Sequence, residues 1–172
     1  MKNFSIAFRY GLIAGVILVA YSIITYIANI SMANTGIAIL SSLITFGVLI
    51  AMAVIGVNKT RDILFNGKFS FLQAFLAGAV IIIIANYISA SYSLLFNTMV
   101  DPDYMARQMD DVIVNLEGKL PEDAMDKMIE SLEKNLDPMK IFIRSLWMSP
   151  IIATVISAII ALVVKKDKTI EL

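Results

Sequence analysis

Four long apolar stretches restrict what this chain can fold into. They contain no aspartate, glutamate, lysine, arginine or histidine, except for Arg144 near one end of the last stretch. A bilayer core about 30 Å thick is crossed by roughly 20 helical residues at about 1.5 Å per residue, so each stretch is long enough to span a membrane. The predicted spans are residues 10–30, 35–57, 71–97 and 141–164.

The composition agrees with a membrane location. Hydrophobic residues make up 59% of the 172 residues, above the share of about 45–50% in soluble domains. The spans use over half of the chain, so no separate catalytic domain fits beside them. We therefore predict an all-α fold, an integral membrane four-helix bundle that forms a single membrane domain over residues 1–172.

The residue types that the chain lacks limit its chemistry. Without cysteine it has no disulfide, thiolate metal site or cysteine nucleophile, and without histidine it lacks the commonest metal ligand and proton shuttle. Serines are plentiful, but no nucleophile elbow accompanies them. We expect no enzyme, no cofactor and no metal. The 14 basic residues balance the 14 acidic ones, so net charge does not favour nucleic acid.

Basic residues gather on one side of the membrane when the segments between spans are assigned alternately to its two sides. Cytoplasmic segments accumulate lysine and arginine, so this side is predicted to be the cytoplasm, with both termini in it. The first stretch is expected to remain as a helix, because the apolar part of a signal peptide is usually only ~7–15 residues long. The basic residues on this side are Lys2, Arg9, Lys59, Arg61, Lys68, Lys165, Lys166 and Lys168.

An acidic segment between the third and fourth spans falls on the opposite side. It holds eleven carboxylates between Asp101 and Asp137. Asp101 is the expected N-cap of a first helix, Pro102 its first residue and Gly118 its C-terminal glycine. A second helix begins near Pro121. The two amphipathic helices predict an extracytoplasmic helical hairpin over residues 101–137. Their apolar stripes contain Met105, Met109, Val112, Leu116, Met125, Met128, Ile129 and Leu132.

These stripes have two main interpretations. They pack against each other and cap the bundle, or they form a groove for an apolar partner, since methionine side chains adapt to varied surfaces. Cation binding by the acidic residues is a third option, but no calcium-loop motif is present. Membrane-surface binding is disfavoured, because the polar face is acidic rather than basic.

The third span carries the most polar residues inside the membrane. Asn86, Ser89 and Ser93 are a candidate intramembrane polar site, either bonding to neighbouring helices or lining a solute path. Gly11-x-x-x-Gly15 in the first span predicts close helix contacts within the chain rather than dimerisation, and the third span carries a similar pair, Ala74-x-x-x-Gly78.

The predicted cytoplasmic loop after the second span contains three cations. Lys59, Arg61 and Lys68 are candidate contacts for lipid head groups, and topological anchoring is the alternative. Asn66-Gly67 predicts a turn in this loop. Ser70, with Gln73 three residues later, predicts a capping box that starts the third span.

Several of these elements together resemble a known family. They are Gly11–Gly15, Gly56–Asp62, Lys68–Gly78 and Asp101–Tyr104. The whole chain is similar to the bacterial membrane family called domain of unknown function 4199. The resemblance implies a four-span protein of the bacterial inner membrane, and it implies no activity and no catalytic residues.

The leading functional hypothesis is a non-enzymatic envelope protein. Its lipid-embedded spans present a hairpin that packs on the bundle, recognises an envelope protein partner or mediates self-association. The alternative is a small transporter or channel component that uses the polar face of the third span.

Overall fold

The computed structural model describes residues 5–31, 33–134 and 136–164, and within them the chain is helical without a β-strand. Lys2, Lys165, Lys166 and Lys168, which helped to predict the sidedness, lie outside these ranges. The helical elements are α1 (Ser5–Ile27), α2 (Thr35–Leu64), α3 (Phe71–Leu95), the π-helical turn η2 (Phe96–Val100), α4 (Tyr104–Leu116), α5 (Glu122–Lys134) and α6 (Pro138–Val164).

Four helices are long and apolar enough to cross a membrane: α1, α2, α3 continued by η2, and α6. Large apolar side chains cover their outward faces. Val163 is 80% exposed and Leu43 is 65% exposed. Exposed apolar surface on this scale is suited to lipid rather than to water. The structure is therefore that of a multi-pass membrane protein.

The second helix is longer than the predicted span. It continues to Leu64, so Asn58–Asp62 lies within α2 and not in a loop after residue 57. Lysine and arginine are good helix formers, and a change from apolar to charged residues does not end a helix by itself. The helix ends just before Asn66 and Gly67, which both have positive φ angles. These two residues form the turn that the sequence predicted.

The capping box at the start of α3 is confirmed. The Gln73 amide donates to the Ser70 hydroxyl, and the Gln73 side chain accepts from the Ser70 amide. The predicted cap of α4 is wrong, because this helix begins at Tyr104 with Asp103 as its N-cap. Asp101 and Pro102 precede this helix. The Asp101 carboxylate accepts hydrogen bonds from the Tyr26 and Arg107 side chains instead of capping the helix.

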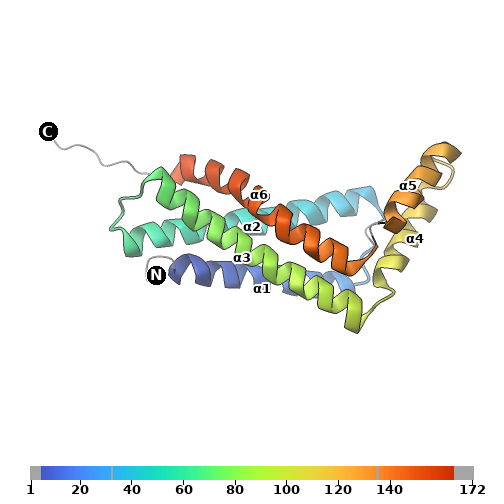
Figure 1. Ribbon diagram of the computed structural model, residues 1–172, viewed down its shortest axis with the longest axis horizontal. Coiled ribbons are helices and arrows are strands. Elements are labelled where there is room, and N and C mark those ends of the chain that lie inside the picture. The colour runs from blue at the N-terminus through green and yellow to red at the C-terminus, as the bar shows by residue number, and fades with distance from the viewer. Residues whose placement is uncertain (1–4, 32, 135, 165–172) are drawn as a thin grey trace.

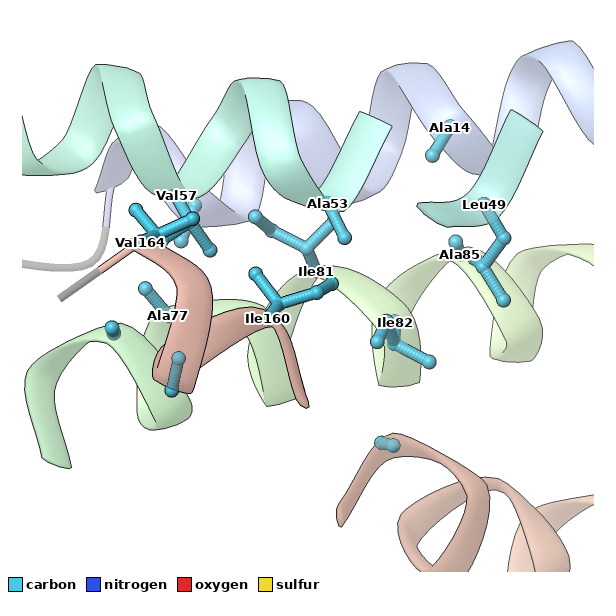
Figure 2. Close-up of a cluster of buried hydrophobic side chains, with 14 of the residues drawn as sticks. Ala14, Leu49, Ala53, Val57, Ala77, Ile81, Ile82, Ala85, Ile160 and Val164 are labelled. Carbon is cyan, nitrogen blue, oxygen red and sulfur yellow. The ribbon is translucent and has the colours of Figure 1, made fainter. Parts of the chain in front are cut away.

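The core of the structure surrounds α3, which packs against α1, α2 and α6. Small residues let these helices approach closely. Figure 2 shows Ile81 of α3 beside Ala53 of α2 and Ile160 of α6. Ala53 and Ile81 are both fully buried. This close-packed region lies on the side of the molecule where α1 begins and α6 ends (Figure 1).

Both small-residue pairs face other helices of the same chain. A Cβ atom built on Gly15 would lie 2.8 Å from Ile88 Cβ of α3, and one built on Gly11 would lie 2.9 Å from Ile84 Cβ. A Cβ atom on Gly78 would lie 2.9 Å from Ser157 Cβ of α6. These glycines therefore serve packing between helices of the same chain, as the sequence predicted for Gly11 and Gly15.

Candidate functional site

Pro150 lies inside α6 and changes the hydrogen bonding of that helix. Proline has no N–H, so the carbonyl of Leu146 loses its normal helical donor. The Tyr87 hydroxyl of α3 donates to this carbonyl at 3.2 Å. Packing against α3 thus compensates for the missing donor.

A cavity of about 290 Å³ lies between α3 and, mainly, the part of α6 that precedes Pro150. Its apolar wall includes Leu94, Phe142 and Met148. Met105 of α4 and Pro138 lie at the end nearest α4, which we call the upper end; the lower end is the one nearest the close-packed core. All three residues of the predicted intramembrane polar site line it. The polar lining consists of Asn86, Ser89, Ser93, Asn97, Ser145 and Ser149.

Two polar atoms of the lining are buried without a hydrogen-bond partner among the described residues. They are Oδ1 of Asn97 and Oγ of Ser149, whose residues are 8% and 3% exposed. Burying such atoms unpaired costs about 1–3 kcal/mol each. Neither residue was among the predicted site residues. Asn97 was visible in the sequence as a polar residue at the end of the third span, whereas a lone serine such as Ser149 gives no signal.

The contact between α3 and α6 sets their relative register. Gly78 lies against Ser157, and the two helices run antiparallel. Moving eight residues along each helix brings Asn86 to the level of Ser149. The end of the cavity nearest the close-packed core therefore combines an amide and a hydroxyl, and Ser89 lies one helical turn above Asn86.

A second cavity of about 290 Å³ lies on the other side of α3, against α1 and α2. It shares a wall formed by Ser89, Ser93 and Asn97 with the first. Its remaining hydroxyls are largely paired, since Tyr21 donates to Ser41 Oγ at 2.9 Å and Thr45 donates to the Ser41 carbonyl at 2.9 Å. Of the two unpartnered polar atoms, Ser149 Oγ thus belongs to the α3–α6 cavity alone, whereas Asn97 borders both cavities.

Helix α4 is attached to the connection between α1 and α2. The Asn115 side chain donates to the Ala33 carbonyl at 2.8 Å, and the Ser31 hydroxyl donates to Asp111 at 2.8 Å. The Asp101 carboxylate accepts hydrogen bonds from both Tyr26 and Arg107. Figure 1 shows α4 and α5 together at one end of the long helices, set across their axis.

The ion pair beside α4 predicts a pH dependence. The hydrogen bond from Arg107 holds the pKa of Asp101 below its ordinary value, although desolvation opposes the shift. A lowered folded-state pKa stabilises the structure above the unfolded value, about 3.9, and the contribution is lost as the pH falls through the folded value. Amide exchange in α4, corrected for intrinsic rates, is therefore expected to be constant from pH 7 to about 4 and to accelerate below that.

The Asp101→Asn variant tests this assignment. It is expected to exchange several-fold faster in α4 at neutral pH and to lose most of the acid-induced change. Asp110→Asn is the matched control, because Asp110 is exposed on the same helix. An identical pH profile in wild type and Asp101→Asn would contradict the role given to this carboxylate.

The eight predicted stripe residues are all half-buried. Met105 lines the upper end of the α3–α6 cavity. The other seven lie on α4 and α5, which contact each other. Val114, outside the stripes, is 70% exposed. The role of these residues in partner binding stays a prediction. They are Met109, Val112, Leu116, Met125, Met128, Ile129 and Leu132.

The three predicted lipid-contacting cations lie near the end of α2 and in the turn that follows. Lys59 and Lys68 are exposed. Arg61 is more enclosed, and its Nε donates to the Asp62 carboxylate at 2.8 Å. Gln73 is engaged in the capping box at Ser70. Contact of these cations with lipid head groups stays a prediction.

The four long apolar helices define an all-α, multi-pass membrane protein. Among the residues that the structure describes, no cluster of three or more acidic side chains is arranged to hold a metal ion. The chain belongs to the family described as "Protein of unknown function (DUF4199)", whose model matches residues 9–166. This confirms the resemblance seen in the sequence. No curated protein and no solved structure matches the chain.

Proposed function

We propose that this protein is a non-enzymatic membrane protein that binds a small uncharged amphiphile in the α3–α6 cavity. The observation that carries this proposal is the pair of buried, unpartnered polar atoms, Asn97 Oδ1 and Ser149 Oγ, in an otherwise largely apolar cavity. Ligand sites commonly combine apolar walls with a few polar groups that fix the orientation of the ligand. No charged residue is among those that line the cavity in the described chain, which favours an uncharged ligand.

The ligand would enter from the bilayer. Ile141 and Met148 line the cavity and are 36% and 41% exposed on the outward face of α6. Methionine is flexible and suits an adjustable entrance. Beyond the other end of the cavity, Ile82 and Ala153 are fully buried in the close-packed core. This packing favours a binding site over an open transport path, so the transporter remains the less supported alternative.

We further propose the bacterial inner membrane as the location, with both termini in the cytoplasm and α4 and α5 on the outer side. The excess of lysine and arginine near the predicted cytoplasmic ends supports this orientation. In this arrangement α4 and α5 form an acidic hairpin over the outer end of a four-helix bundle. Met105 of α4 lines the end of the cavity away from the close-packed core, and a hydrogen bond joins α4 to the α1–α2 connection.

Photolabelling tests the binding function. Purified protein in nanodiscs is irradiated with a long-chain alcohol that carries a diazirine, and labelled peptides are mapped by mass spectrometry. We expect labelling to concentrate on residues 138–152. Ala90→Phe, which fills the cavity, is expected to reduce this labelling about tenfold, while Ala20→Phe on the exposed face of α1 leaves it unchanged. Labelling that is spread evenly over all lipid-facing helices would contradict the proposal.

Partner recognition by α4 and α5 is the second candidate function. It is favoured by the position of these helices, which stand beyond the end of the spans (Figure 1), and by the partial exposure of their apolar stripes. The partner would be an envelope protein or a second copy of the chain. This function is compatible with ligand binding, because only Met105 belongs to both sites.

A further inference from the structure

We infer that the ligand of the α3–α6 cavity has an uncharged hydrogen-bonding group at each end and an apolar middle. This inference rests on the proposed binding function and specifies its ligand. It follows from the distribution of satisfied and unsatisfied polar atoms along the cavity. The ends carry polar groups without partners, whereas the serines between them have partners already.

The lower end of the cavity holds Asn86, Ser89 and Ser149. The Ser149 hydroxyl is buried without a partner, and neither the Asn86 amide nor the Ser89 hydroxyl forms a hydrogen bond within the described chain. The register of α3 and α6 brings Ser149 to the level of Asn86. An amide and two hydroxyls both donate and accept, so this end suits a carbonyl or a hydroxyl.

The upper end contains a single unpartnered acceptor, on a residue that also borders the second cavity. The Asn97 amide nitrogen donates to the Ser93 carbonyl at 2.7 Å and to Ser93 Oγ at 3.3 Å, which leaves only Oδ1 without a partner. This end therefore requires a donor on the ligand, a hydroxyl or an N–H group. Asn97 lies in the π-helical turn η2, and such turns occur frequently at functional sites.

The middle of the cavity offers little to a polar ligand group. The Ser145 hydroxyl donates to the Phe142 carbonyl at 2.7 Å, and Ser93 Oγ accepts from the Asn97 side-chain amide at 3.3 Å. Leu94 and Met148 are apolar neighbours of these serines in the lining. The distance along α3 from Asn86 to Asn97 is about 16 Å at 1.5 Å per residue, which sets the separation of the two polar ends of the ligand.

Competition against the diazirine alcohol tests the inference in nanodiscs. The competitors are dodecanol, with one hydroxyl, and the twelve-carbon diol with a hydroxyl at each end, compared at equal mole fraction in the bilayer. One additional hydrogen bond contributes about 0.5–1.5 kcal/mol, so the diol is expected to compete about 2- to 13-fold better than dodecanol. Asn97→Leu removes the one unpartnered acceptor of the upper end and is expected to bring the ratio close to one, whereas Ser149→Ala leaves Asn86 and Ser89 at the lower end and is expected to reduce the ratio only in part.

The outcomes separate this inference from the binding function. Equal competition by the diol and dodecanol in wild type would overturn the two-ended ligand and leave the proposed function standing. If neither compound competes, the polar atoms are hydrogen-bonded by water alone, and both proposals fail. A diol advantage that is unchanged in Ser149→Ala would also overturn the inference, and this variant tests it even if Asn97→Leu does not fold.

Discussion

Replacing Gly15 by leucine is expected to destabilise the protein by about 3 kcal/mol or more, the upper range for overpacking a tight contact. Even a Cβ atom at this position would lie 2.8 Å from Ile88 Cβ, which is fixed to the backbone of α3 and cannot move aside independently. The larger side chain must separate α1 from α3. Unfolding in mixed detergent micelles, followed by circular dichroism, measures the loss.

Gly47 provides the matched control for this substitution. It lies on α2, and a Cβ atom built there has no neighbour within 4 Å. Gly47→Leu is expected to leave stability unchanged or to raise it by up to about 1 kcal/mol through helix propensity. If the two variants unfold at the same detergent fraction, the close α1–α3 contact is not important for stability.

Truncating Ile81 to alanine is expected to cost about 2–3 kcal/mol, because it leaves a void at the centre of the helix packing. Ile81 is fully buried and reaches Gly56 of α2 with its Cδ1 atom. Helices in lipid associate largely through van der Waals packing, because the hydrophobic effect does not drive them together there. The loss of packing contacts therefore lowers stability directly. The same micelle titration measures this effect.

Ile159→Ala is the control for the void. Ile159 is 59% exposed on α6, where lipid occupies the space that a shorter side chain vacates. The expected change is below about 0.5 kcal/mol. A loss at position 159 as large as that at position 81 would mean that outward-facing residues contribute to helix packing, contrary to the arrangement described above.

The sequence predicted the long helices well because their signal is physical and local. Runs of apolar residues indicate spans, and Ser70 with Gln73 specifies a cap through bonds between near neighbours. The ends of α2 and α4 were predicted less well. The charges around Arg61 mark a change in polarity, but α2 continues through them to Leu64. Asp101 does not cap α4, because its carboxylate accepts a hydrogen bond from Tyr26, a residue distant in sequence.

The candidate site was predicted only on its α3 side. Asn86, Ser89 and Ser93 recur at helical spacing, and they share one cavity. The opposite wall was not predictable, because the register that brings Ser149 to Asn86 depends on the contact between Gly78 and Ser157. The missing partner of Ser149 Oγ is likewise a property of the packed helices and not of a local motif.

The π-helical turn η2 connects the wall of the cavity to α4 within a few residues. It contains Asn97, which lines the cavity, and it is followed by Asp101, whose amide donates to the Phe96 carbonyl at 2.9 Å and whose carboxylate accepts from Arg107 of α4. A displacement of α4 away from the spans would therefore shift the same turn that positions the Asn97 oxygen. The cavity wall and α4 share one short turn, so a displacement of α4 is transmitted to Asn97 through only a few residues.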